Sequence, residues 1–243
     1  MGRRTERIET FGLERGRRLA GKYEVLGLLG AGWEGEVYHV VELGTGIERA
    51  AKVFFPERNP HNRAVTSYAK KLDRLEDCGI VIRYHTRDTF QFRRQRLTFL
   101  VSEYVHGELL PHFIARQKGK RLHPFEALHL IYPLVAGLEH IHRAGEYHGD
   151  VHDENIIVRR IGIGFDLKLV DFFGWARRTR AHVQEDIRDA IRVFYDVLGG
   201  AKHYRRLPPE IKQVCCGLKR SLIRQKFPTS QRLREHLDTI EWA

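Results

Sequence analysis

A change of hydrophobic pattern near residue 106 is the feature that most restricts the fold of this chain. Before that point, strand-like runs alternate with glycine-rich or charged turns, at 23–28, 36–41, 49–54, 89–92 and 97–103. One helix-like stretch, 65–75, interrupts them. Later, apolar residues recur at three- and four-residue spacing, which predicts helices around 131–141, 187–198, 211–222 and 233–240. A β-rich half followed by an α-rich half predicts an α+β fold with two lobes.

These patterns divide the 243 residues into three parts, which are 1–20, 21–105 and 106–243. The first part is a basic N-terminal extension, rich in arginine, which we expect to be a mobile tail or a helix on the surface. The second part is the β-rich lobe and the third is the helical lobe. A hydrophobic content of 42% is enough for a sizeable core.

Composition favours certain partners and settings. Lys and Arg total 42 against 31 Asp and Glu, a net charge of +11, which either attracts anionic partners or simply keeps the surface solvated. The cysteines, Cys78, Cys215 and Cys216, form no CxxC pair and no disulfide framework, so we expect a reduced, cytoplasmic setting. No apolar run reaches the length of a membrane span, and we expect no membrane partner.

A glycine-rich segment, GAGWEGEV at 30–37, lies between two of the strand-like runs. Its glycines, Gly30, Gly32 and Gly35, let backbone N–H groups approach phosphate oxygens because no Cβ stands in the way. A dinucleotide-binding turn needs a helix after the third glycine, whereas a strand-like run follows Gly35. The segment therefore favours a hairpin over phosphates, and a merely flexible hairpin is the alternative.

A lysine, Lys52, follows in the apolar strand-like run RAAKVF. Alone it is equally well explained as a lysine at a strand edge. After a glycine-rich hairpin, it is a candidate cation for the α- and β-phosphates of ATP.

The strongest motif is HGDVHDEN at 148–155, followed by an apolar run and by DFFG at 171–174. Phosphoryl transfer needs a carboxylate that orients the acceptor hydroxyl and oxygen ligands for Mg²⁺. Asp150 suits the first task, and Asn155 with Asp171 suits the second. His152 is a candidate contact of the γ-phosphate. A polar loop with chance histidines, or a histidine metal site, is the alternative; the metal site would need a helix here, and strand-like runs flank the loop instead.

The order of glycine hairpin, strand lysine, Asp-x₄-Asn and Asp-Phe-x-Gly resembles the protein-kinase-like superfamily over about residues 21–240. The resemblance implies a bilobal kinase-like fold that uses ATP and Mg²⁺ to phosphorylate a hydroxyl, in the leading hypothesis Ser or Thr of a protein. It implies Ser102 as gatekeeper and Asp186 as an aspartate that opens a helix and braces the catalytic loop. It also implies a set of nucleotide contacts, namely Gly30, Gly32, Gly35, Val37, Ala50, Lys52 and the backbones of Glu103 and Val105.

The chain departs from that family in several places. HGD replaces HRD and, with His152, is similar to aminoglycoside- and choline-kinase-type enzymes and to some RIO-like kinases. The interval from Asp171 to Asp186 is too short for a usual activation segment, and one residue is inserted in DFG. The small-lobe helix should carry a glutamate that pairs with Lys52, yet its expected place is near Tyr68 and the next acids, Asp73 and Glu76, come one or two turns late.

These departures keep two alternatives open, a small-molecule kinase and a pseudokinase scaffold. For the leading hypothesis, the basic cluster RRTR at 177–180 would lie beside the active site. We expect it to steer an anionic acceptor, such as an acidic or RNA-associated protein. No recognised nucleic-acid-binding motif is present, and the sequence does not decide whether the chain binds nucleic acid directly.

Overall fold

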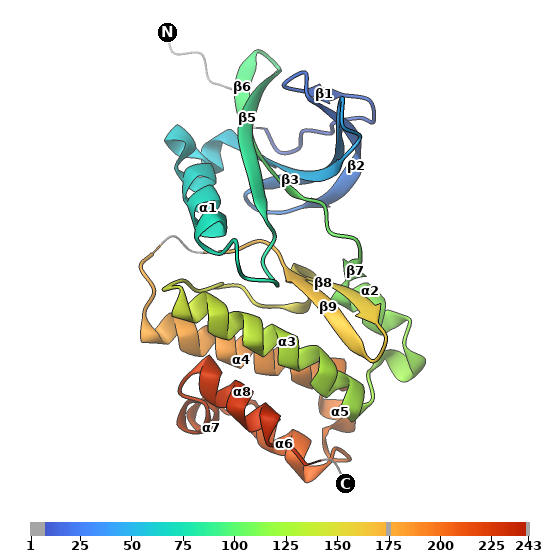
Figure 1. Ribbon diagram of the computed structural model, residues 1–243, viewed down its shortest axis with the longest axis vertical. Helices are drawn as coiled ribbons and strands as arrows, with labels where there is room; N and C mark the ends of the chain where they lie inside the picture. Colours follow the sequence, from blue (N-terminus) through green and yellow to red (C-terminus); the bar gives the residue numbers. More distant parts are fainter. Residues whose placement is uncertain (1–7, 174–175, 242–243) are drawn as a thin grey trace. The chain divides into compact units, whose positions relative to one another are not determined.

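Figure 1 shows the computed structural model, which describes residues 8–173 and 176–241. The chain forms two compact units, the first made of 1–76 with 82–105 and the second of 77–81 with 106–243. The first is built on an antiparallel sheet and the second is mainly helical, so the α+β fold with two lobes is confirmed.

The first unit contains a six-stranded sheet in the order β1-β2-β3-β4-β6-β5, in which every neighbouring pair is antiparallel (Figure 1). The five expected strands and the one expected helix are all present. Their bounds are β1 Arg18–Leu19, β2 Tyr23–Ala31, β3 Gly35–Glu42, β4 Glu48–Phe54, α1 Arg63–Arg74, β5 Tyr84–Phe92 and β6 Gln95–Glu103.

The segment before β1 belongs to the core of this unit. Ile8, Phe11 and Leu13 are buried in the same apolar cluster as the sheet. The buried carboxylate of Glu36, on β3, accepts hydrogen bonds from the Phe11 N–H (3.2 Å) and the Thr10 hydroxyl (2.7 Å). The expected surface tail is therefore wrong from Ile8 onward, because three apolar side chains and one buried acid outweigh the charge of the neighbouring arginines.

The second unit combines helices with a three-stranded sheet in the order β7-β8-β9. No helix in the described residues is long and apolar enough to cross a membrane. The bounds are β7 Glu108–Leu109, α2 Leu110–Ala115, α3 Pro124–Arg143, β8 Ile156–Ile161, β9 Gly164–Leu169, α4 Arg180–Val197, α5 Ala201–Tyr204, α6 Pro209–Cys215, α7 Arg220–Lys226 and α8 Ser230–Asp238.

Helix α3 is the centre of this unit and packs against α4, α8 and β9. Pro124 occupies its first turn, as expected, where a missing N–H costs no helical hydrogen bond. Its buried face carries Leu130, Leu134, Leu138 and Ile141. The segment 77–81 crosses this helix so closely that a Cβ at Gly137 would come within 2.1 Å of Ile80, which explains why 77–81 groups with the second unit.

One expected helix, 211–222, is divided. Helix α6 ends at Cys215, and Cys216, Gly217 and Leu218 all have positive φ before α7 begins at Arg220. Positive φ cannot continue a right-handed helix. The expected spacing also placed Leu222 on the buried face, but that residue is exposed and α7 buries Ile223 instead.

Candidate active site

The glycine-rich hairpin, residues 30–37, joins β2 and β3. Gly35 is required by packing, because a Cβ there would lie 2.0 Å from the Val53 carbonyl oxygen on β4. At Gly30 and Gly32 a Cβ would meet nothing within 4 Å. The backbone at these two glycines therefore faces open space, as a loop that receives a ligand must.

Strand register brings four predicted nucleotide contacts onto one face of the sheet. Gly35 lies opposite Phe54, and Val37 lies opposite Lys52. Directly opposed residues share a face, and so do residues two apart on a strand. Gly35, Val37, Ala50 and Lys52 therefore line the same side of the first unit.

Lys52 lies in a nearly buried polar setting. Its Nζ is 2.9 Å from Glu34 Oε2, and the two side chains are only 9% and 11% exposed. The same ammonium is 4.9 Å from the ring centroid of Tyr68, which is buried on α1. Tyr68 stands where the resemblance predicted a glutamate, and the glycine-rich hairpin supplies a carboxylate instead.

The predicted adenine-binding backbone lies at the end of β6. Ser102 is buried opposite Ala50. The Glu103 N–H donates to the Arg83 carbonyl (3.0 Å), which fixes the end of the strand. Val105 follows two residues later, outside regular structure and half-buried.

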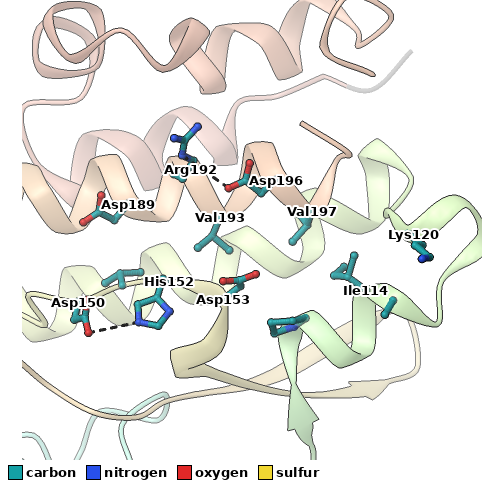
Figure 2. Close-up of a pocket in the computed structure, with 13 residues that line it drawn as sticks. Ile114, Lys120, Asp150, His152, Asp153, Asp189, Arg192, Val193, Asp196 and Val197 are labelled. Atoms are coloured by element: carbon teal, nitrogen blue, oxygen red, sulfur yellow. Dashed lines mark ion pairs between the residues drawn. The ribbon is translucent and has the colours of Figure 1, made fainter. Parts of the chain in front are cut away.

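In the second unit, Asp150 belongs to the HGD loop, residues 147–155. The side-chain nitrogen of Asn155 donates to the Asp150 carbonyl (3.0 Å) and to its Oδ2 (3.2 Å). The same nitrogen lies 2.9 Å from His152 Nε2, which accepts only when that nitrogen is unprotonated. A protonated His152 would pair with Asp150 instead, at 3.4 Å (Figure 2).

His148 ties the HGD loop to the DFFG segment. Its Nδ1 accepts from the Asp150 N–H (3.3 Å), so Nε2 carries the proton and donates to the Val170 carbonyl (3.0 Å). Its carbonyl accepts from the Phe173 N–H (2.9 Å), and its ring packs on buried Phe172, with centroids 4.4 Å apart. Asp171 is therefore held between two anchored residues; Gly174 of the motif lies outside the described residues.

Asp186 supports the HGD loop from helix α4, as the resemblance implied. Its fully buried carboxylate accepts from the N–H groups of His148 and Gly149, both at 2.8 Å, and lies 2.9 Å from His142 Nε2. Burial alone would raise the pKa of Asp186, but the hydrogen bonds and the nearby histidines lower it. Helix α4 begins at Arg180, so the expectation that Asp186 opens it is wrong; Thr179 caps the helix.

Gly149 explains why this chain lacks the usual arginine. Its φ is +83°, and a Cβ would lie 2.5 Å from the Phe173 carbonyl oxygen and 3.0 Å from the Tyr147 ring. Any side chain at this position would displace the DFFG segment. The Tyr147 ring also stacks on His182 in the first turn of α4, with centroids 4.0 Å apart.

Asn155 and Asp171 offer the kind of oxygen donors that Mg²⁺ prefers. The Val170 N–H donates to the Asn155 carbonyl (3.0 Å), which holds the residue before Asp171 against the backbone of Asn155. The hydrogen bonds of the Asn155 side chain to Asp150 and His152 use its nitrogen and not its oxygen. No cluster of three or more His, Cys, Asp and Glu side chains that could hold a metal ion is found among the described residues. Mg²⁺ in phosphate-binding sites is commonly held by one or two protein oxygen donors together with phosphate oxygens and water, and a pair of donors fits that pattern.

A cavity of about 530 Å³ opens beside Asp150 (Figure 2). Helix α2 contributes apolar residues to its wall, and α4 and the HGD loop contribute most of the polar ones. Four acids line it, Asp150, Asp153, Asp189 and Asp196, together with the cations Lys120 and Arg192. Burial raises the pKa values of Asp189 and Asp196, and the nearby Arg188 and Arg192 partly offset the rise.

The two units together form a protein kinase fold. A crystal structure of the PknI kinase domain of Mycobacterium tuberculosis aligns with a TM-score of 0.63 and 19% identity, over 93% of this chain and 98% of that one. The protein kinase domain family matches residues 23–212. The chain therefore belongs to the protein kinase domain family.

Its curated relatives include much longer proteins. A probable serine/threonine-protein kinase of Streptomyces coelicolor, SCO3848, is 31% identical over 163 residues, which is 66% of this chain and 23% of that protein. Serine/threonine-protein kinase PrkC of Bacillus subtilis is 27% identical over 160 residues, or 65% and 23%. The chain thus spans less than a quarter of the length of these relatives.

Sequence reasoning missed two supporting residues. Glu34 lies inside the glycine-rich hairpin, where its neighbours drew attention to the backbone and not to its carboxylate. His142 looks like any polar residue of an amphipathic helix, yet it is buried between Asp186 and the Ser230 hydroxyl (2.9 Å). The spacing between these partners, 44 and 88 residues, leaves no local signal.

Proposed function

We propose that this chain transfers the γ-phosphoryl group of ATP to a hydroxyl, in the leading case that of Ser or Thr in a protein. The observation that carries the proposal is the construction around Asp150. The Asn155 side chain donates a hydrogen bond to the Asp150 carboxylate, and the Asp186 carboxylate accepts hydrogen bonds from two backbone N–H groups of the same loop. A preset carboxylate of this kind is what an acceptor hydroxyl needs for orientation.

In the proposed reaction, the acceptor oxygen attacks the γ-phosphorus while the bond to the bridging oxygen of ADP breaks. Asp150 accepts the hydroxyl proton. Lys52 binds phosphate oxygens, and the backbone amides of the glycine-rich hairpin approach them. His152, beside Asp150, contacts the γ-phosphate, and the Glu103 carbonyl and the Val105 N–H hold the adenine.

Asn155 and Asp171 would hold Mg²⁺, whose charge neutralises the phosphates when it is bound. Asn155, whose side chain donates to Asp150, would supply one oxygen donor, and Asp171 would supply another.

Two features bear on the acceptor. Arg177, Arg178 and Arg180 are exposed at the start of α4 and support the attraction of an acidic or RNA-associated protein. The acidic lining of the cavity disfavours an anionic group inside it, so this attraction would act outside the cavity. The size of the cavity, about 530 Å³, also suits a small molecule, and this keeps a small-molecule acceptor as the second candidate.

We also propose a cytoplasmic setting. All three thiols are free, and burial raises the pKa of Cys215 to about 12, which makes it a poor nucleophile for disulfide exchange.

The test is transfer of label from γ-labelled ATP with Mg²⁺, in wild type and in Asp150→Asn, with and without a generic protein substrate. Removing the proton acceptor should lower kcat about 10²-fold or more. Asp166→Asn makes the same chemical change on an exposed strand of the second unit and should leave transfer unchanged. Label that appears on no protein but on added small alcohols would favour the second candidate, and ATP binding without any transfer would indicate a scaffold.

A further inference from the structure

The missing helix glutamate leaves open which group orients Lys52. Helix α1 offers the buried ring of Tyr68, which attracts the ammonium through its face but carries no charge. The next acids along the chain, Asp73 in the last turn of α1 and Glu76 just after the helix, are both exposed. The Glu34 carboxylate lies at hydrogen-bonding distance from the Lys52 ammonium, 2.9 Å, in a setting where both side chains are about nine-tenths buried.

The turn that carries Glu34 is fixed at several points. The Gly32 N–H donates to the Gly35 carbonyl (2.9 Å), which closes the turn. The Glu34 carbonyl accepts from the Phe55 N–H (2.9 Å), just beyond the end of β4. The guanidinium of Arg58 lies 3.9 Å from the ring centroid of Trp33. These contacts attach the tip of the hairpin to the segment that directly follows the strand bearing Lys52.

A carboxylate in so fixed a turn can set the direction of a flexible lysine at little further cost in side-chain entropy. The bond is charge-assisted and shielded from water, which makes it stronger than an exposed pair. An ammonium has three N–H donors, so it can hold a carboxylate and a phosphate oxygen at the same time.

We propose that Glu34 is the positioning residue for Lys52 and replaces the acid that the small-lobe helix lacks. The inference rests on the proposed function, because it assigns to Lys52 the binding of ATP phosphates. It also changes which element controls that lysine. The orientation of Lys52 depends on the glycine-rich hairpin, which receives the nucleotide, and not on the position of helix α1.

Glu34→Gln tests this, since it removes the charge and keeps the shape of the side chain. We expect kcat to fall about ten-fold or more, because 1.36 kcal/mol of lost transition-state stabilisation is a factor of ten. The matched control is Glu76→Gln, the same change on an exposed acid next to helix α1, and it should match wild type. Glu34→Asp keeps the charge at a shorter reach and should restore part of the lost kcat. Thermal unfolding of each variant checks the fold.

The dissociation constant of ATP, measured by calorimetry, separates positioning from competition. A positioning role leaves this constant within about three-fold of wild type while kcat falls. Tighter ATP binding by Glu34→Gln with unchanged kcat would mean that Glu34 competes with the phosphates, and it would overturn the inference. An equal kcat in Glu34→Gln and Glu76→Gln, or a loss in Glu76→Gln alone, would also overturn it. A wild type that transfers no phosphate to any acceptor would instead refute the proposed function, and the inference with it.

Discussion

At the scale of single residues, the HGD loop depends on a glycine that has two separate requirements. Gly149 has a φ of +83°, which any other L-residue adopts only with strain, and the space for a Cβ is occupied by the Phe173 carbonyl oxygen and the Tyr147 ring. Its N–H also donates to Asp186. The glycine is thus a condition for packing the DFFG segment onto the loop that carries Asp150.

The two requirements can be separated by comparing Gly149→Ala with Gly145→Ala. Gly145 has almost the same φ, +82°, but nothing lies within 4 Å of a Cβ there. Gly145→Ala should cost about 1–2 kcal/mol of stability, the strain of a left-handed residue. Gly149→Ala should cost about 1–3 kcal/mol more, as overpacking does, and should lower kcat. Urea unfolding with both variants measures the difference; equal losses would contradict the role assigned to the Phe173 contact.

At the scale of elements, helix α4 is the support of the HGD loop. It brings one carboxylate, Asp186, to two backbone N–H groups of that loop and to His142 on α3. Helix α3 in turn is held to α8 through His142 and Ser230. The loop therefore rests on three packed helices and has little freedom to adopt a different shape.

We expect Asp186→Asn to destabilise the chain by roughly 3–5 kcal/mol, because it removes a buried charge from several donors at once. The amide of asparagine would also place N–H groups against N–H groups. Glu185→Gln, the neighbouring exposed position on the same helix, should change stability by less than about 0.5 kcal/mol. Thermal unfolding of the two variants, with labelled-ATP transfer measured below their Tm, is the appropriate comparison. Wild-type stability in Asp186→Asn would contradict this role.

At the scale of the whole molecule, charge is unevenly distributed. The chain carries a net charge of +11, yet the cavity beside Asp150 is lined by four aspartates and only two long cations. The exposed arginines at 177, 178 and 180 lie on the same helix, α4, or just before it. The exposed arginines would therefore attract an anionic acceptor from a distance, whereas the cavity lined by aspartates would favour a cationic group inside it.

Changing Arg177, Arg178 and Arg180 together to glutamate should raise the KM of an acidic protein acceptor about ten-fold at low salt and leave kcat unchanged. The same three substitutions to glutamate at Arg93, Arg94 and Arg96, which are exposed in the β5–β6 turn or at the start of β6, alter the net charge equally. They should have a smaller effect. Steady-state kinetics at two salt concentrations measures both, and an unchanged acceptor KM in the first variant would remove the proposal of an anionic acceptor.

The sequence alone was sufficient for the class of fold and for most of its elements. Alternation in the first half and three- and four-residue spacing in the second are local properties, set by which face of each element must be buried. The glycines, Lys52 and the HGD and DFFG motifs were likewise readable, because their spacing along the chain reflects a local turn or strand.

Only the tertiary structure decided how those residues are supported. Three contacts join residues that are far apart in the chain. Glu34 and Lys52 are 18 positions apart, His142 and Asp186 are 44 apart, and Glu36 is 25 or 26 positions from Phe11 and Thr10. The break at Cys216–Leu218 was hidden for a similar reason, because α6 and α7 both pack against α4 although the chain between them leaves the helical conformation. Hydrophobic spacing records which side of an element is buried, whereas the partner of a buried charge is chosen by the packing of distant segments, and a single sequence does not record that choice.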